Sequence, residues 1–152
     1  MSISLPNVRK LFIPDEGYTI FDADLEGADA QVVAWEVEDE ELKDVFRAGN
    51  NIHVKNARDM FPDKVKGFSD EAIEKNKIYK EVKTGVHGTN YGAGSRTLSQ
   101  IVGWTVADTE KFQSKWFSLH PGIRLWHNRT EIAIRTKRAV RNSFGYSRTY
   151  FD

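Results

Sequence analysis

Hydrophobic and polar positions change their period along the chain, and the first change marks a short strand followed by a helix. Over residues 17–24 apolar and polar side chains alternate, which predicts a strand, and residues 14–17 (PDEG) are a turn signal that opens it. Alternation places Asp22 and Asp24 on the same side of this strand. Helical spacing of apolar residues begins at Gly27 and continues to Trp35, so the pattern predicts a strand-to-helix turn directly after Asp24.

Helical patterns fill most of the remaining chain. Capping residues, prolines and glycines bound predicted helices at residues 39–46, 52–61, 69–91, 95–102, 106–119 and 121–140. The final residues, 141–150, predict a hairpin with Gly145 and Tyr146 at its centre. Trp104, Trp116 and Trp126 fall at helical positions, where large aromatic side chains contribute to a core. The fold class expected is therefore mainly α with a small β element (α+β).

Composition narrows the class of protein. The chain has 152 residues, 39% of them hydrophobic, which is too apolar for disorder and suits one domain or, as we favour, a contiguous piece of a larger one. No apolar run approaches the ~18 residues of a membrane helix, and the first ten residues lack the apolar core of a signal peptide. Cysteine is absent, which excludes disulfides and thiolate metal sites. We expect a cytoplasmic protein with no membrane partner.

Charge is divided unequally although the net charge is zero. Residues 1–50 carry 12 acidic and 4 basic side chains, whereas residues 51–152 carry 10 acidic and 18 basic ones. Such asymmetry can bring two parts of one fold together. It also suits a polyanion held between a basic lobe and metal ions bound to a carboxylate-rich lobe. Charge alone leaves both interpretations open.

The stretch from Asn76 to Gly92 carries the strongest functional signal. Tyr79, Lys83, His87 and Tyr91 are spaced four residues apart and share one helix face, which Lys80 joins at a spacing of three. Ammonium, imidazole and phenol groups on one face suit a ligand with phosphates and a flat ring. A solvated helix face with one buried tyrosine is the alternative.

Other polar residues have both a functional and a structural interpretation. Asp24 and Asp29 could hold a metal near the strand end, or they could cap the following helix and complement its dipole. His53 lacks a second ligand at metal-binding spacing and is interpreted as structural. A basic group near the end of the chain could be a solvated face or a phosphate-contacting edge: Arg135, Lys137, Arg138 and Arg141.

Three stretches in order resemble the palm and fingers region of the family A DNA polymerases, the DNA polymerase I type of bacteria and phages. They are RKLFIPDEGYTIFDADLEGADAQ, GNNIHVKNARDMF and YKEVKTGVHGTNYGAG. The later stretches WFSLHPGI and FGYSRTYFD are similar to the family's next fingers helices and the hairpin after them, and HGTNYG resembles phage members. The resemblance therefore covers nearly the whole chain.

This resemblance implies a role for each matching residue. Asp24 matches the first catalytic aspartate of motif A, which binds two Mg²⁺ ions together with the main-chain carbonyl of Leu25. Lys83 matches the catalytic lysine that meets the incoming triphosphate. His87 takes the place of an aromatic residue packed on the nucleotide sugar, and Tyr91 matches a tyrosine beside the templating base. Phosphoryl transfer needs positioning and charge neutralisation, which a cation opposite a metal-binding carboxylate provides.

Departures from the family pattern limit these roles. Tyr79 stands where the family has a phosphate-binding arginine, which leaves Lys80 as the nearest substitute, and Asp29 replaces the longer glutamate that discriminates against ribose. The chain ends before motif C, with its second catalytic aspartate. The resemblance thus implies a partial palm segment at 1–36, fingers helices at 37–140 and the start of a palm hairpin at 141–152.

The expected function is that of a fragment of a template-directed DNA polymerase acting in DNA replication. Such an enzyme transfers a nucleotide from a dNTP to a primer 3′-OH with two Mg²⁺ ions, and the chain alone is expected to be inactive. Its expected partners are dNTP, primer-template DNA and the remaining palm and thumb half of the enzyme. A non-catalytic module that binds nucleotide or single-stranded DNA, and a decayed remnant, are the alternatives. A downstream gene encoding motif C would favour a split enzyme.

Overall fold

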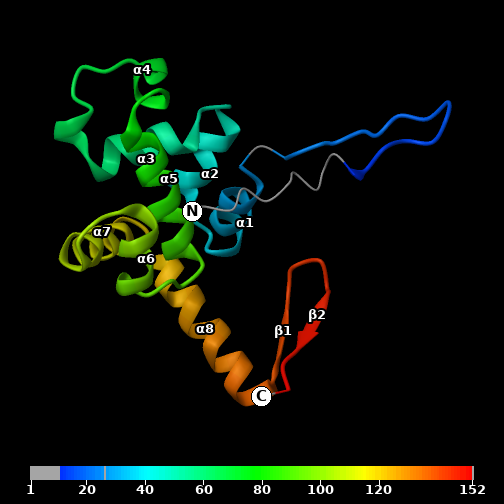
Figure 1. The fold of residues 1–152 in the computed structure, drawn as a ribbon. Helices are drawn as coiled ribbons and strands as arrows, with labels where there is room; N and C mark the ends of the chain where they lie inside the picture. The colour runs from blue at the N-terminus through cyan, green and yellow to red at the C-terminus, as the bar shows by residue number, and fades with distance from the viewer. Residues whose placement is uncertain (1–10, 26, 152) are drawn as a thin grey trace, which may run out of the picture.

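The computed structural model describes residues 11–25 and 27–151 and is mainly helical (Figure 1). In chain order the described elements are α1 (Ala28–Glu36), α2 (Glu40–Arg47), α3 (Ile52–Met60), the 3₁₀ turn η2 (Pro62–Lys64), α4 (Asp70–Glu74), α5 (Lys77–Asn90), α6 (Ser95–Val102), α7 (Val106–Leu119), α8 (Pro121–Lys137), β1 (Ala139–Arg141) and β2 (Ser147–Thr149). Helices and one small antiparallel sheet confirm the mainly α fold class with a small β element.

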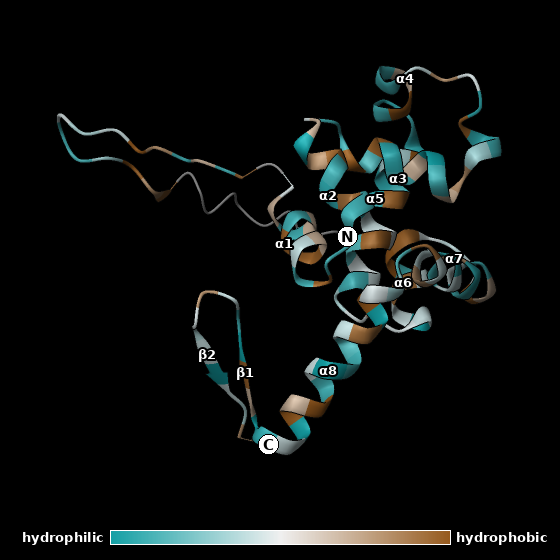
Figure 2. Ribbon diagram, turned by 180° about the vertical axis from the view of Figure 1, so that it is seen from behind, coloured by the Kyte–Doolittle hydropathy of each residue, from teal (hydrophilic) through white to brown (hydrophobic). Residues whose placement is uncertain are grey.

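Helix α5 lies at the centre of the helical body. It packs against α3 and α4 toward one end and against α6 and α7 toward the other (Figures 1 and 2). Ile78, Val82 and Val86 repeat every four residues along α5 and are all buried, so this stripe forms part of the core. Because α5 is held on several sides, its remaining polar face has a fixed direction.

The observed start of α5 differs from the predicted one, whereas its end agrees. A continuous helix from Ser69 to Tyr91 is wrong, because α4 ends at Glu74 and Asn76 begins α5 as a new N-cap. The Asn76 side chain accepts a hydrogen bond from the Ile78 N–H at 3.0 Å, an alternative to continued helix that asparagine offers. Gly92 ends α5 as predicted, with a left-handed φ of 76°.

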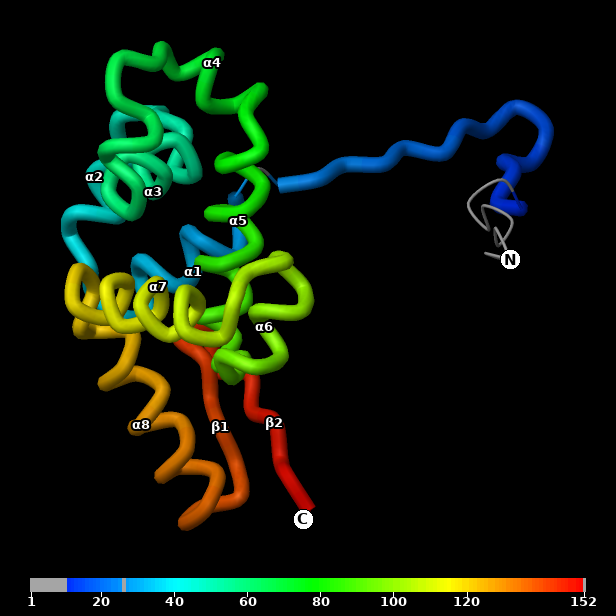
Figure 3. The backbone as a smooth tube through the Cα atoms, turned by 60° about the vertical axis from the view of Figure 1, so that its left-hand side comes forward, coloured from blue at the N-terminus to red at the C-terminus, as the bar shows by residue number. Residues whose placement is uncertain are grey.

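The strand predicted at residues 17–24 is not formed. Residues 18–25 have extended or irregular backbone without a ladder, are exposed, and run away from the helical body as an arm (Figure 3). The turn that precedes them is present, since the Tyr18 N–H donates to the Asp15 carbonyl at 3.0 Å. Alternation made the segment suitable for a sheet, but among the described residues β1 and β2 pair only with each other.

Helix α8 leaves the helical body, and the hairpin after it turns back, so that Ser143 at its tip donates a hydrogen bond to Glu36 at the end of α1 (Figure 1). α8 ends at Lys137 rather than at residue 140, and Arg138 follows in the left-handed region at φ 49°. The chain then enters β1, and Ala139 pairs with Thr149 in antiparallel register. The predicted hairpin is confirmed, with its first strand beginning two residues earlier than expected.

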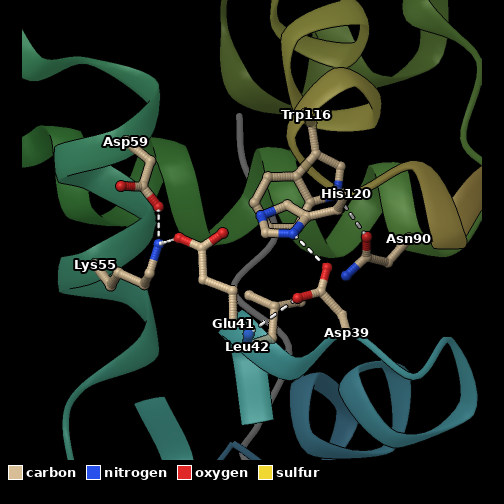
Figure 4. A network of polar contacts seen from close by, with 8 residues as sticks. All are labelled: Asp39, Glu41, Leu42, Lys55, Asp59, Asn90, Trp116 and His120. Atoms are coloured by element: carbon tan, nitrogen blue, oxygen red, sulfur yellow. Dashed lines mark hydrogen bonds and ion pairs between the residues drawn. The ribbon is translucent and has the colours of Figure 1, made fainter. Parts of the chain in front are cut away.

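Buried polar contacts join helices that are distant in sequence (Figure 4). His120, at the α7–α8 junction, is 1% exposed, and its Nδ1 lies 2.6 Å from Asp39 Oδ2 at the start of α2. Trp116 is equally buried and donates from Nε1 to Asn90 Oδ1, at the end of α5, over 2.8 Å. Of the three tryptophans predicted for the core, Trp116 is fully buried, whereas Trp104 and Trp126 are half-buried.

No helix within residues 11–25 and 27–151 has the length and apolar character needed to cross a membrane.

Candidate functional site

The polar face of α5 opens onto a cleft between α5 and the start of α1, here called the α1/α5 cleft. Its volume is about 490 Å³. The predicted site residues that line it come from two segments. One is the turn before α1 together with the first turn of α1, and the other is the second half of α5 with its C-cap: Asp24, Leu25, Asp29, Lys83, His87 and Tyr91. Five of these residues were singled out from the sequence pattern, and Leu25 was added only because the family resemblance gives its carbonyl a metal-binding role. The fold brings all six to one surface.

A second cleft of about 390 Å³ lies next to it, between the start of α3 and the first half of α5, and is called the α3/α5 cleft. Asn51, His53 and Tyr79 line it, together with Gly27 and Lys83. Gly27, His53 and Lys83 also line the α1/α5 cleft, so the two clefts adjoin at these residues. The helix face predicted from four-residue spacing therefore borders one continuous polar surface.

Lys83 occupies the junction of the two clefts. Its side chain is exposed, and no carboxylate among the described residues forms an ion pair with it. Lys77, on the same helix, differs because its Nζ lies 2.8 Å from Glu81 Oε1. Lys80 is exposed but lines neither cleft, so its supporting role remains a prediction. An accessible, unpaired ammonium group at the centre of the surface is suited to an anionic ligand.

Aromatic rings and one carboxylate form the far end of the α1/α5 cleft. The rings of His87 and Tyr91 lie with centroids 4.6 Å apart. Asp29, in the first turn of α1, approaches His87 Nδ1 to 3.8 Å. The negative charge of Asp29 raises the pKa of Tyr91, so its phenol stays protonated and able to donate. A flat, partly apolar surface with polar edges results.

Tyr79 has a structural task as well as a place in the cleft. Its hydroxyl accepts a hydrogen bond from Asn51 Nδ2 at 3.2 Å, and its ring meets the His53 ring edge-on at 5.7 Å. Asn51 also caps α3 by accepting from the His53 N–H at 2.9 Å. Tyr79 thereby fixes the start of α3 against α5.

His53 is the residue of this surface that sequence analysis undervalued. Burial, followed by the positive charge of Lys83 and that of His87, lowers the pKa of His53 from 6.5 to about 4, so the imidazole is neutral at pH 7. Its Nδ1 is buried without a hydrogen-bond partner among the described residues. Only the packing of α3 on α5 brings it to Lys83, and no local spacing carries that information.

The carboxylates were tested as a site for the Mg²⁺ ions that the resemblance implies. Asp24 and Asp29 both line the α1/α5 cleft, but no third acidic, histidine or cysteine side chain in the described part of the chain joins them as a metal-binding group. The Leu25 carbonyl accepts the Ala28 N–H at 3.4 Å as the chain turns into α1. Mg²⁺ requires about six oxygens in octahedral order, so these residues do not make a complete site.

The basic residues near the end of the chain are engaged locally in part. Arg135 Nη2 pairs with Glu131 on the same helix at 2.5 Å. Arg138 donates to the Phe151 carbonyl at 3.3 Å and Arg141 to the Gly145 carbonyl at 3.0 Å, while Lys137 is exposed. These bonds stabilise the helix end and the hairpin, which favours the structural interpretation.

The fold and the site define a mainly helical module with a polar cleft suited to a phosphate-bearing, planar ligand. Residues 3–152 match DNA polymerase family A. The chain belongs to that family.

Known relatives agree with this assignment. The thermostable DNA polymerase I of Thermus filiformis is 35% identical over 141 residues, which are 93% of this chain and 16% of that protein. DNA polymerase I of Geobacillus stearothermophilus is 30% identical over 118 residues, or 77% of this chain and 13% of the relative. The chain therefore spans a small part of the relatives it matches.

A solved structure shares the fold. It is described as "POL domain of Pol1 from M. smegmatis complex with DNA primer-template and dNTP" and superposes with a TM-score of 0.70 at 17% identity. The match covers 83% of this chain and 21% of that one. At this identity the likeness shows the common fold of the helical module.

Proposed function

We propose that this chain supplies the nucleotide-binding side of a template-directed DNA polymerase. The observation that carries the proposal is the α1/α5 cleft, which collects the motif A turn and the lysine-bearing face of α5 on one surface. Residues 37–140 would act as fingers, residues 1–36 as part of the palm and residues 141–152 as the start of a palm hairpin. Membership of DNA polymerase family A supports this division.

Each residue of the cleft has a chemical task in the proposed enzyme. Lys83 neutralises the triphosphate of the dNTP, since it is exposed and unpaired at the junction of the two clefts. The adjacent rings of His87 and Tyr91 offer apolar faces to the sugar and to the templating base. Asp29, whose carboxylate lies 3.8 Å from His87 Nδ1, is proposed to contact the sugar edge and disfavour ribose. Neutral His53 adds a polar ring without charge repulsion toward Lys83.

Nucleotidyl transfer itself would require a larger assembly. The chemistry that Mg²⁺ would supply at a completed site is activation of the attacking hydroxyl and stabilisation of the leaving group. Asp24 and the Leu25 carbonyl are the groups proposed to contribute to that site, alongside carboxylates from outside residues 11–25 and 27–151. Primer-template DNA and the rest of a palm and thumb are the proposed partners. The chain alone is therefore proposed to be inactive.

Primer extension by the chain mixed with the remaining part of a family A polymerase tests the proposal. Lys83→Ala should lower kcat/KM for dNTP by about 30- to 1,000-fold, equivalent to about 2–4 kcal/mol of transition-state stabilisation. Lys77→Ala removes the same charge from the same helix, but its ammonium already pairs with Glu81 and lies outside both clefts. It should leave kcat/KM nearly unchanged. Equal losses in the two variants would refute the assigned face.

A further inference from the structure

A third cleft lies outside the site described above, between the end of α3 and the first turns of α7. Its volume is about 370 Å³. Aromatic side chains form its floor and lysines its rim, and the complete lining is Met60, Phe61, Lys64, Trp104, Asp108, Lys111, Phe112 and Lys115. We refer to it as the aromatic–lysine cleft.

Its floor is a closed group of three rings. Trp104 and Phe112 have centroids 4.9 Å apart, and Phe61 lies 5.9 Å from each of them. Phe112 is 4% exposed and belongs to the core, whereas Phe61 and Trp104 are half-buried. The core therefore fixes the floor, while two of its rings keep surface open to a ligand.

The lysines of the rim outnumber its carboxylates, three to one. Lys64 Nζ lies 4.5 Å above the Phe61 ring, and Lys115 donates to the Met60 carbonyl at 2.8 Å. In the described part of the chain none of the three lysines forms an ion pair. The single carboxylate, Asp108, accepts a hydrogen bond from the Thr105 hydroxyl at 2.7 Å. Three cations around an apolar floor favour an anionic ligand with a flat, apolar part.

This cleft is distinct from the face that carries Lys83. Phe112 and Trp104 pack over Gly85 of α5, where an added Cβ would lie 2.9 Å from Phe112 and 3.2 Å from Trp104. Positions two residues apart on a helix point about 200° from each other. Lys83 and His87 therefore point away from the aromatic–lysine cleft, which opens on the other side of α5. Figure 3 shows α7, which carries much of the cleft, crossing α5.

We propose that the aromatic–lysine cleft binds a nucleotide unit, with the base against Trp104 and Phe61 and the phosphate at Lys64 and Lys111. Base–aromatic contact and phosphate–ammonium attraction are the two interactions by which proteins hold single strands without reading sequence. A bare anion would not use the ring floor, and an uncharged apolar ligand would not use the rim. The unit could be a free nucleotide or one residue of a single strand.

The complete chain with Lys83→Ala, which removes the cation at the junction of the α1/α5 and α3/α5 clefts, is the background for the test. Binding of fluorescently labelled dT8 is followed by anisotropy, and the indole N–H of Trp104 is followed by NMR. Replacing both Lys64 and Lys111 with alanine should weaken dT8 binding about tenfold or more and reduce the salt slope of log K by about 0.7, because the two lysines hold one phosphate and about 0.7 is lost per phosphate contact on single strands. The same titration should shift the Trp104 indole signal before these substitutions and not after them.

The matched control replaces Lys66 and Lys75 with alanine, which removes the same charge from exposed positions that do not line the cleft. Its dT8 affinity should stay within about twofold. Equal weakening by the two double variants would overturn the proposal, as would a Trp104 signal that dT8 leaves unmoved but an acidic peptide shifts.

Chain length of the ligand separates the two sources of a nucleotide unit. If the cleft serves a single strand, affinity should rise from dTMP through dT4 to dT8, and dTMP should compete weakly. If it serves a free nucleotide, dTMP should bind as tightly as dT8 and displace it completely. Inorganic phosphate that matches dTMP would show that the rings contribute nothing and would overturn the proposal.

Discussion

At the scale of single residues, His53 couples the site to the stability of the fold. Its pKa is lowered from 6.5 to about 4, by burial first and then by the charges of Lys83 and His87. Between these values the unfolded chain binds a proton that the folded chain excludes, so folding stability rises with pH through this window. Above about pH 6.5 both states are neutral at His53 and its contribution is flat.

Urea unfolding at about pH 5 and about pH 7.5 measures this contribution. The parent chain should gain on the order of 1 kcal/mol more on raising the pH than His53→Gln does, a figure reduced from the full pKa shift because solvent screens a half-buried group. His87→Gln is the comparison variant: it leaves the burial of His53 unchanged and removes only the smallest cause of the pKa shift, so it should retain most of the gain. If His53→Gln shows the same pH dependence as the parent, the assigned pKa is wrong.

The side chains that share the polar face of α5 could be predicted from the sequence. Residues spaced four apart on a helix lie on one face, whatever the helix packs against. Lys83, His87 and Tyr91 therefore come together in one cleft as expected. The place of His53 depended on contact between two helices. The placement of Lys80 outside both clefts also depended on how α5 is rotated against its neighbours.

At the scale of elements, Gly85 determines how closely α7 approaches α5. A Cβ at this position would lie 2.9 Å from two atoms of the Phe112 ring. Helix propensity alone makes Gly85→Ala stabilising by about 1 kcal/mol, whereas overpacking costs about 1–3 kcal/mol. Because Phe112 is held by Phe61 and Trp104, we expect an overpacking cost in the upper part of this range, about 2–3 kcal/mol, and so a net loss of unfolding free energy of about 1–2 kcal/mol in urea denaturation.

Lys80→Ala serves as the control on the same helix, since Lys80 is exposed, and should change stability by no more than about 0.5 kcal/mol. A stabilised Gly85→Ala chain would show that α7 moves freely away from α5.

Asp39 connects three helices through one carboxylate. It caps α2 by accepting the Leu42 N–H at 3.0 Å and bonds the buried His120 at 2.6 Å. Asp39→Ala removes both hydrogen bonds and leaves the buried His120 ring without its partner. It should lower the unfolding free energy by about 2–4 kcal/mol, measured by urea denaturation. Asp39→Ser keeps a capping oxygen and should recover about 1 kcal/mol of that loss. Equal destabilisation by both variants would mean that the cap contributes nothing.

Element boundaries were predicted well where a cap or a glycine acts locally. α6 and α7 begin and end where expected, and Asp39 and Asn51 cap α2 and α3. The prediction of a strand at residues 17–24 was wrong because a strand depends on a non-local partner. Alternation of polar and apolar residues does not show whether a neighbouring strand is present to pair with. The break between α4 and α5 was missed because Asn76, which caps α5, lies within a segment whose apolar spacing is typical of one continuous helix.

At the scale of the whole molecule, the turn before α1, which we propose to be motif A, lacks a complete set of metal ligands among residues 11–25 and 27–151. Asp24 and Asp29 line the cleft, and the Leu25 carbonyl already accepts the Ala28 N–H. Mg²⁺ gives up its water reluctantly and needs more oxygens than these to stay bound. In the proposed enzyme, a further part of the polymerase and the phosphates of a bound nucleotide would complete the shell.

Titration with Mg²⁺, followed by NMR, should therefore leave the Asp24 and Leu25 signals of the isolated chain unmoved at about millimolar metal. The same chain should extend no primer. Adding the remaining part of a family A polymerase together with dNTP should produce both a metal response and extension, and Asp24→Asn should abolish them. Asp22→Asn is the control, because Asp22 does not line the cleft, and should abolish neither. Tight, saturable Mg²⁺ binding by the isolated chain that needs both aspartates would instead mean that this arm carries a metal site of its own.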